Sequence, residues 1–356
     1  MRLAVIGPTL EFSKGSYILK SLGEHLESPD LQVSYLGYHD VILNTSIVYL
    51  ANGQLYRKLW PIIYKNSFRR GIRLFRTIIE KSYFVKYVMK SFDCILASIT
   101  ALEFLGIAEL AKRNFPIVFW DIDSPNIPYR KYASLIRDNH VVFCYSKGGL
   151  KIWEENGVNS YFLPLACDTH IFYPMKNSEK KIEILFTGRY LKDRIEGYRR
   201  YLYPLIENFG KRVVIVGDGW EIDKHGVKAT ILPGIPYHLL NKLYNMAKIC
   251  INIHRDKARS CHSAFNLRVF ESLGAGQFMI SDNILGIDEF FRPGKELVIS
   301  EGGSRLIEEV TFYLENEKDR SRIARAGHMK VLREHVIGLR AKQVRKIMED
   351  KLLEIC

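Results

Sequence analysis

The sequence predicts an α/β protein made of two doubly wound modules. Three observations support this fold class: the chain opens with a strand, a glycine loop and a helix; two successive series of apolar strand-like runs follow; and a polar linker separates the two series. A chain of 356 residues also exceeds the size at which single cores stop growing, roughly 250–300 residues, so about two domains are expected.

The first series begins with the short buried strand 2–8, which leads through a loop containing Gly15 to a helix near 16–26. Further strands of this series are expected at 32–36, 93–98, 117–120, 141–145 and 161–163. Because these runs are continuously apolar and helical patterns such as 102–113 lie between them, a parallel sheet covered on both faces is predicted. Residues 166–180 then form the linker.

The second series is expected at 182–187, 212–216, 229–232, 248–253, 278–281 and 296–299, with a helix near 238–246. The tract from 318 to 356 is helical and rich in Lys, Arg and Glu, and it is long enough to return to the first domain. The expected organisation is a first Rossmann-like domain over 1–172, a second over 173–335, and a C-terminal helix over 336–356 that packs back on the first. Ligands of two such modules bind in the cleft between them.

Composition and charge restrict the class of protein. Lys plus Arg exceed Asp plus Glu by 13, which indicates an anionic partner such as phosphorylated ligands, a phospholipid surface or nucleic acid. The six cysteines are scattered without a CxxC pair, which favours reduced core thiols and a cytoplasmic protein. The N-terminal apolar run 3–6 is too short for a signal peptide, and no run reaches the roughly 18 apolar residues of a membrane span.

The segment 57–90 departs from this plan because it interleaves basic residues with aromatic and aliphatic ones, and its one acidic residue is Glu80. A basic amphipathic segment of this kind can lie on an anionic membrane, which would place the protein peripherally on the inner face. An ordinary helical pair with a solvated basic face explains the same pattern.

The stretch 263–276 carries the strongest signal for a ligand. It follows the strand-like run 248–253, offers Ser263 or Asn266 as a helix N-cap, and closes on glycines that suit a helix end. Free amides at a helix start attract phosphate. Arg268 would add a cation there, and Glu271, one turn further, can accept hydrogen bonds from sugar hydroxyls.

Three glycine loops follow strands of the same expected sheet. Gly188 lets the backbone approach a ligand closely, and the nearby Arg189 and Arg194 can pair with a diphosphate. Gly217 forms the second loop, and residues 232–238 form the third. Since parallel strands end at one edge, all three loops are expected to meet the 266–271 helix start.

The order of these motifs resembles the donor domain of GT-B glycosyltransferases, over roughly 166–340. The motifs are Gly188-Arg189, Val216–Gly219, Gly234–Tyr237, Ile251-Asn252 and Asn266–Gly276. Residues 286–294, 323–327 and 331–335 are similar to the CgeB-like (spore maturation) branch near the group 1 glycosyltransferases.

This resemblance implies a GT-B fold and an enzyme that transfers a sugar from a nucleoside-diphosphate sugar to an acceptor, which would be a glycan, a lipid-linked molecule or a protein. In that scheme Glu271 would bind the donor ribose, and Arg189 with Arg194 would face the diphosphate. The backbone amides near Asn266 and Leu267 would hold the diphosphate, and Ile235, Pro236 and Tyr237 would contact the base. No cofactor beyond the nucleotide sugar is implied.

The sequence departs from the group 1 pattern at Ser263, where those enzymes commonly carry the first of two glutamates eight positions apart. Its role near the transferred sugar is therefore open, although His262 or Ser263 can contact sugar hydroxyls. A retaining mechanism is expected only because the resembling families are retaining.

Asp121 and Asp123 end a strand of the first domain and form a short Asp-x-Asp pattern, which also occurs in metal-dependent glycosyltransferases. Two Rossmann-like modules favour the metal-independent alternative, in which cationic side chains and helix amides stabilise the leaving diphosphate. Asp123 is the candidate catalytic or acceptor-binding carboxylate; the alternative is a turn or helix-capping role before Pro125.

His254 follows the strand into the site and is a candidate phosphate contact, although a lone histidine is more often structural. His254, Cys261 and His262 lack a fourth zinc ligand, so no metal site is predicted. Two other functions fit the sequence: a non-catalytic scaffold that binds an anionic membrane or nucleic acid, and a sugar-nucleotide epimerase on the same fold. For the transferase, nucleic acid is not expected as a partner.

Overall fold

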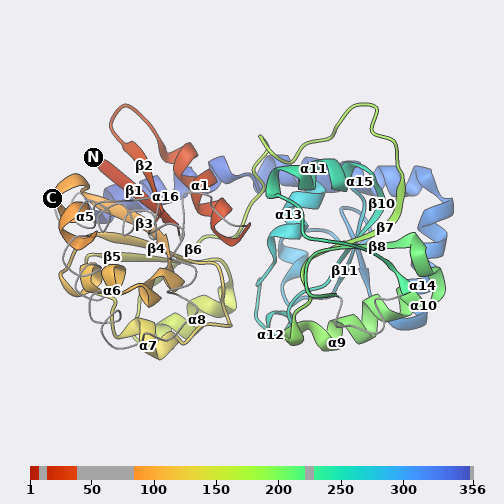
Figure 1. The fold of residues 1–356 in the computed structure, drawn as a ribbon, viewed down its shortest axis with the longest axis horizontal. Helices are drawn as coiled ribbons and strands as arrows, with labels where there is room; N and C mark the ends of the chain where they lie inside the picture. Colours follow the sequence, from red (N-terminus) through yellow and green to blue (C-terminus); the bar gives the residue numbers. More distant parts are fainter. Residues whose placement is uncertain (8–13, 38–83, 221–227, 353–356) are drawn as a thin grey trace, which may run out of the picture.

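The computed structural model describes residues 1–7, 14–37, 84–220 and 228–352, and it shows two α/β domains side by side (Figure 1). Each domain contains a six-stranded, wholly parallel sheet. The predicted fold class, two Rossmann-like modules, is confirmed.

The first sheet has the strand order β2-β1-β3-β4-β5-β6. Its strands are β1 (Arg2–Gly7), β2 (Gln32–Gly37), β3 (Cys94–Ser98), β4 (Ile117–Asp121), β5 (His140–Cys144) and β6 (Ser160–Phe162). Its helices are α1 (Lys14–Leu26), α5 (Val85–Ser91), α6 (Leu105–Lys112), α7 (Tyr129–Ala133) and α8 (Lys147–Glu155), with a 3-10 turn at Ile99–Glu103. All residues of β4 and β5 are buried, as the apolar runs predict for strands covered on both faces.

The second sheet has the order β12-β11-β10-β7-β8-β9. Its strands are β7 (Ile182–Thr187), β8 (Val213–Val216), β9 (Thr230–Leu232), β10 (Ala247–Asn252), β11 (Met279–Asp282) and β12 (Val298–Ser300). Its helices are α9 (Ile195–Gly197), α10 (Tyr203–Phe209), α11 (Leu240–Asn245), α12 (Asp256–Arg259), α13 (Leu267–Gly274), α14 (Gly303–Glu315) and α15 (Glu317–Glu334). A π-helical turn at Tyr198–Leu202 joins α9 to α10, so these form one continuous helical segment.

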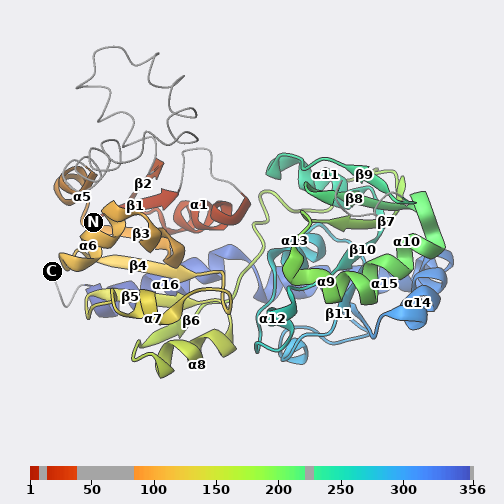
Figure 2. The ribbon, with the colours of Figure 1, turned by 60° about the horizontal axis from the view of Figure 1, so that its bottom comes forward.

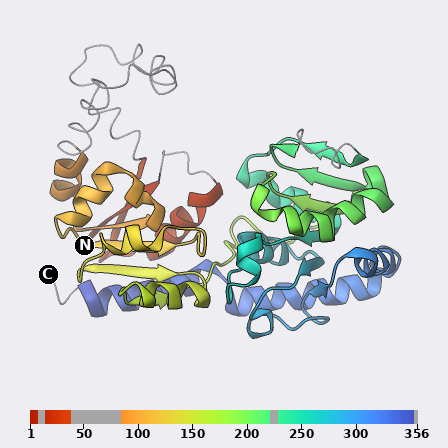
Figure 3. The ribbon, with the colours of Figure 1, turned by 90° about the horizontal axis from the view of Figure 1, so that it is seen from below.

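The expected C-terminal tract consists of two helices, α15 and α16 (Ile337–Leu352), which separate at His335 and Val336. The chain crosses between the domains there, beside its first crossing: the Cys167 amide donates to His335 at 2.8 Å, and the Ile337 amide donates to Cys167 at 2.9 Å. Helix α16, drawn in blue, then runs along the first domain (Figure 3). Its Arg345 donates to Ser28 at 3.0 Å, so this helix fastens the two domains together.

The segment 57–90 lies mostly outside the described residues, which resume at 84. Its described end is the start of α5, where Phe84, Val85 and Val88 are buried in the core of the first domain. In the described part of the chain, no helix is long and apolar enough to cross a membrane. Five cysteines, at 94, 144, 167, 250 and 261, are buried free thiols, as predicted.

Candidate functional site

A cavity of about 240 Å³ lies where the strands of the second sheet end, beside the start of α13. It is lined by Thr187, Gly188, Arg194, Tyr237, Leu240, Tyr244, Asn266, Leu267, Arg268 and Glu271. Most of these are predicted site residues, and the structure brings them together in one place. Thr187, Leu240 and Tyr244 were not assigned a role from the sequence.

The three glycine loops form the backbone framework of this cavity. The Gly188 amide donates to Val216 at 2.8 Å, and the Gly217 amide donates to Leu232 at 3.0 Å. A Cβ on Gly217 would lie 2.2 Å from the Gly188 carbonyl oxygen, so only glycine fits there. The third loop joins through Gly234, whose amide donates to the Asp218 carboxylate at 2.7 Å.

Helix α13 begins at Leu267 with Asn266 as its N-cap, as one of the two predicted alternatives requires. The Asn266 side chain does not cap the helix. Its Nδ2 lies 3.4 Å from the Ile253 carbonyl, while its Oδ1 is buried and has no hydrogen-bond partner among the described residues. The other alternative, Ser263, is fully buried with a positive φ of 61°, and its Oγ lies 2.8 Å from His262 Nδ1.

Two buried guanidinium groups, of Arg194 and Arg268, converge on Gly188. A Cβ at Gly188 would lie 2.7 Å from Arg268 Nη2 and 3.4 Å from Arg194 Nη1. Arg268 donates from Nε to Thr187 at 3.1 Å and from Nη1 to Asn252 at 2.9 Å. Burial, and then the charge of Arg268, lower the pKa of Arg194 to about 10.

Within the described residues, neither arginine forms an ion pair with a carboxylate, since both are absent from the ion pairs of this region. Two adjacent buried cations without a counter-ion repel each other and cost free energy. They lie beside the positive end of a helix. This arrangement is suited to an anion.

In the same cavity, the buried Glu271 carboxylate is held by two tyrosines. Tyr237 donates to Oε1, and Tyr244 donates to Oε2 at 3.2 Å. The ring of Tyr237 also packs at 4.6 Å against that of Tyr17 in α1, the helix on the side of the first domain that faces the second (Figure 2). The carboxylate is therefore fixed as a hydrogen-bond acceptor beside the arginines.

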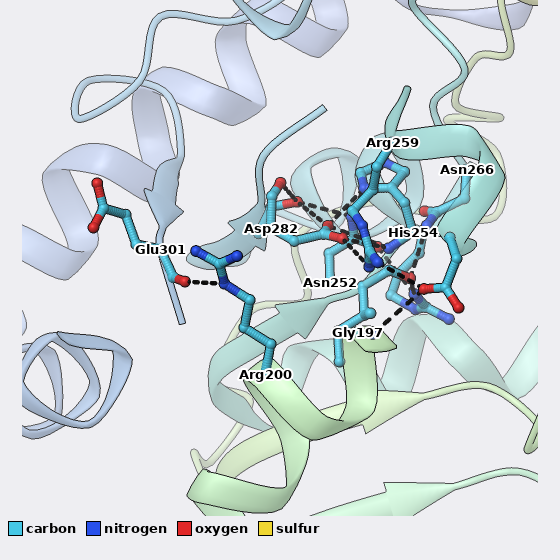
Figure 4. Close-up of polar contacts among 12 residues, drawn as sticks. Gly197, Arg200, Asn252, His254, Arg259, Asn266, Asp282 and Glu301 are labelled. Atoms are coloured by element: carbon cyan, nitrogen blue, oxygen red, sulfur yellow. Dashed lines mark hydrogen bonds and ion pairs between the residues drawn. The ribbon is translucent and has the colours of Figure 1, made fainter. Parts of the chain in front are cut away.

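Asn252, His254 and Asp282 belong to a buried polar network (Figure 4), and this network positions Arg268 through Asn252. Asn252, which accepts from Arg268, donates to Ser281 at 2.9 Å. His254 Nδ1 lies 2.7 Å from Asp282 Oδ1, and Arg259 lies 3.7 Å from the other carboxylate oxygen. His254 and Asp282 are both fully buried. The structure thus places His254 in the interior and not on the cavity wall, where the sequence had placed it as a phosphate contact.

The remaining predicted donor residues surround the cavity without lining it. Arg189 is exposed beside Gly188, and Gly217 lies beneath it. Ile235 and Pro236 precede Tyr237, and Ile235 packs against the core. The unassigned Tyr244 follows Tyr237 and Leu240 at helical spacing, and this periodicity is the signal that could have identified it.

The first domain contributes Asp123 to the cleft side, half-buried after β4. Burial, and then the charge of Asp121, raise the pKa of Asp123, while Arg255 of the second domain lowers it. Asp121 itself is fully buried and accepts hydrogen bonds from Ser124 and Trp153, so the two carboxylates do not form a matched pair of ligands. Across the described residues, no group of three His, Cys, Asp or Glu side chains is arranged to hold a metal ion.

The two domains also meet at the start of α8. The Gly148 amide donates to the His262 carbonyl at 3.0 Å, and Lys147 pairs with Glu289. Glu289 in turn lies 3.1 Å from His262 Nε2. The stretch immediately before the site helix is therefore a contact surface for the first domain.

Residues 194–346 match a family model described as glycosyl transferase-like. No curated protein sequence matches the chain. Among solved structures, the whole chain is similar to sucrose-phosphate synthase from Thermosynechococcus elongatus, with 13% identity, 100% of each chain covered and a TM-score of 0.68.

Two further structures share the fold. The Anabaena protein Alr3699/HepE in complex with UDP-glucose has 12% identity, with 98% of this chain and 100% of that chain covered and a TM-score of 0.69. The T4 phage β-glucosyltransferase has 14% identity, with 99% of each chain covered and a TM-score of 0.63. The predicted enzyme class, a glycosyltransferase, is confirmed by the family match, and the predicted GT-B fold is confirmed over the whole chain.

Proposed function

We propose that this protein transfers a sugar from a nucleoside-diphosphate sugar to an acceptor and holds the donor diphosphate between the start of α13 and the guanidinium groups of Arg194 and Arg268. The observation that carries the proposal is the unpaired charge of these two buried arginines, which converge on Gly188. A diphosphate supplies the missing counter-charge, and guanidinium groups match phosphate oxygens in geometry.

The other cavity residues fit the remaining parts of a nucleotide. Glu271 accepts hydrogen bonds from the ribose hydroxyls, and Tyr237 with Ile235 and Pro236 lies where the base extends. Arg189 stands at the mouth, near the outer phosphate. Because Alr3699/HepE is found with UDP and UDP-glucose on the same fold, a uridine nucleotide is the first donor to test.

We propose a metal-independent reaction. The charge that develops on the leaving diphosphate is stabilised by Arg194, Arg268 and the amides of α13, which are already in place before the reaction. Asp123, whose pKa is raised by burial, faces the cleft as the candidate catalytic or acceptor-binding carboxylate. Retention of the anomeric configuration and membership of the CgeB-like branch belong to this proposal through the sequence resemblance.

Nucleotide binding is tested by thermal shift with UDP, GDP, ADP and TDP at millimolar concentration. A ligand present at 100 times its Kd stabilises the folded protein by about 2.7 kcal/mol. We expect one nucleotide to raise the Tm and Glu271→Ala to abolish that rise, whereas Glu196→Ala, at an exposed position outside the cavity, leaves it unchanged. If none of the four nucleotides shifts the Tm, donor binding is refuted.

Hydrolysis of the matching nucleotide sugar then separates an enzyme from a binding scaffold. The transferase releases nucleoside diphosphate slowly to water and faster when the acceptor is supplied. A protein that binds the nucleotide sugar and releases nothing is a scaffold.

We further propose that the segment 57–90 brings the enzyme to an anionic membrane surface on the cytoplasmic side, where a lipid-linked acceptor would be available. The supporting observation is the density of Lys and Arg among apolar residues in this segment. Sedimentation with phosphatidylglycerol vesicles, and not with phosphatidylcholine vesicles, is the expected result at low salt. Binding that is equal for both lipids contradicts it.

A further inference from the structure

A second cavity, of about 270 Å³, opens at the opposite edge of the second sheet, where the strands begin. Lys180 precedes β7, Lys248 is the second residue of β10, and Phe278 precedes β11. Helix α15 forms the other wall through Arg320, Ala324 and His328. Since all strands are parallel, the length of the sheet separates this cavity from the one beside α13.

The lining of this cavity is strongly cationic. It includes four cations and one carboxylate, namely Lys180, Lys248, Arg320, Arg325 and Glu317. Lys248 lies 3.7 Å from Glu183, outside the cavity lining. Of the described carboxylates, none lies within ion-pair distance of Lys180, Arg320 or Arg325, as the ion pairs of the neighbouring residues show.

The groups that contact these cations are neutral. Lys180 donates to the Gln277 amide oxygen, and Arg320 donates to the carbonyls of Tyr313 and Leu314 at the end of α14. Such dipoles solvate a charge without neutralising it. Desolvation lowers the pKa of both Lys180 and Arg320, and the charge of Arg320 lowers that of Lys180 further, whereas the charge of Glu317 raises both. With four cations and one carboxylate in its lining, the cavity retains a net positive charge.

We propose that this cavity binds a small phosphate-bearing anion, independently of the donor cavity. A phosphate monoester carries close to two negative charges at neutral pH and accepts hydrogen bonds from Lys and Arg on several sides at once. The cavity volume admits the phosphate together with a small organic group, while Phe278 and Ala324 offer apolar contact for that group. The shared chemistry, the phosphate group, is supplied by free inorganic phosphate or by a phosphorylated metabolite.

The site is linked to the helix that carries the donor residues. Gln277, the partner of Lys180, donates to the Ala275 carbonyl at 2.5 Å, directly after α13. His328 Nδ1 lies 3.3 Å from the Leu273 carbonyl in the last turn of α13. An anion that engages Lys180 thus acts on the residues that hold the end of this helix.

The test is isothermal titration of the full-length protein with inorganic phosphate and, separately, with glucose 6-phosphate. We expect the double variant Lys180→Gln/Arg325→Gln to weaken binding at least about tenfold. A matched variant, Lys176→Gln/Arg322→Gln, removes the same charge from positions outside the cavity and keeps the wild-type affinity. Urea midpoints of both variants verify that they fold.

Arg194→Met serves as the control for the donor cavity: any phosphate binding in that cavity weakens in this variant, while the site at Lys180 keeps its affinity for both probes. If the two probes bind with similar affinity, free phosphate is a sufficient ligand. If glucose 6-phosphate binds more tightly, the ligand is a phosphorylated metabolite. Either result supports the proposal. Equal weakening by the two double variants overturns it, because binding then follows net charge. Loss of binding in Arg194→Met alone also overturns the proposal, because the phosphate then occupies the donor cavity. The proposal is overturned as well if neither probe binds.

Discussion

Arg194 offers a perturbation whose effects on stability and on ligand binding have opposite signs. Its side chain is 8% exposed, its Nε has no hydrogen-bond partner among the described residues, and its neighbour Arg268 carries the same charge. Replacing it with methionine keeps an unbranched apolar stem and removes the guanidinium group and its charge. We therefore expect Arg194→Met to stabilise the ligand-free protein and to weaken nucleotide binding.

The magnitude of the stability effect follows from the pKa. Folding lowers the pKa of Arg194 from the ordinary value of a free guanidinium to about 10, chiefly through burial. One pKa unit corresponds to about 1.36 kcal/mol, so the charged Arg194 side chain costs the folded state about 3 kcal/mol at neutral pH. This cost is present in full below pH 10 and fades as the pH rises from there toward the pKa of the free guanidinium, because the neutral form is the one that burial favours. Allowing for the lost contact with Tyr198, a gain of about 2 kcal/mol is expected for the variant.

Binding changes in the other direction. A charge-assisted hydrogen bond contributes about 1.5–3 kcal/mol, so the Kd for the bound nucleoside diphosphate should rise by about 10-fold to 100-fold. Urea unfolding measures the free energy of unfolding, and isothermal titration measures the nucleotide Kd. Arg199→Met is the matched control, since Arg199 is an exposed arginine paired with Glu196, and both values should stay near wild type. A destabilised Arg194→Met protein with unchanged affinity would refute the reasoning, because Arg194 would then serve the fold alone.

Three further outcomes follow. Gly148→Ala places a Cβ 2.7 Å from Cys261 Sγ across the domain boundary. The rate of sugar transfer should therefore fall at least about tenfold, while the nucleotide Kd stays within about twofold. A loss of nucleotide affinity would contradict this prediction. Asp282→Ala leaves the buried His254 without its carboxylate partner. Urea unfolding should show that the free energy of unfolding falls by about 2–3 kcal/mol. An unchanged urea midpoint would contradict this prediction. Burial, and then the charge of Arg340, lower the pKa of His335 to about 4. The neutral form of His335 therefore stabilises the protein above pH 6.5, and this contribution is lost as the pH falls toward 4. The free energy of unfolding should drop by about 2 kcal/mol between pH 7 and pH 5, and the drop should be smaller in His335→Gln.

The sheet and the edge that carries the cavity were predictable from the sequence because parallel strands buried on both faces leave continuous apolar runs. Residues 182–187 match β7 at both ends, and the glycines after β7, β8 and β9 mark the same edge. The start of α13 was predictable for a similar reason, since Asn266 precedes an amphipathic run. These features depend on local pattern and on one general rule of sheet topology.

The partners of individual side chains were not predictable, because they depend on pairs far apart in the chain. His254 turns inward since Asp282, on the neighbouring strand, offers it a buried carboxylate. The proximity of Arg194 to Arg268 could not be predicted from the sequence either, because 73 other residues separate them. The break between α15 and α16 arises where Cys167 takes the backbone hydrogen bonds of His335 and Ile337 in place of helical partners.

Among the described residues, those that line the cavity beside α13 all belong to the second domain, from Thr187 to Glu271. The first domain reaches this region through Tyr17, which packs on Tyr237, and through Gly148, which docks on His262. Nucleotide affinity should therefore depend on the second domain, whereas sugar transfer also requires the contact between the domains. Under the proposed function, this separation explains why a cation such as Arg194 can be kept at a cost to stability: a bound diphosphate would compensate its charge before the first domain completes the site. Variants at the domain contact should then change kcat and leave the nucleotide Kd intact, while variants at the arginines should change both.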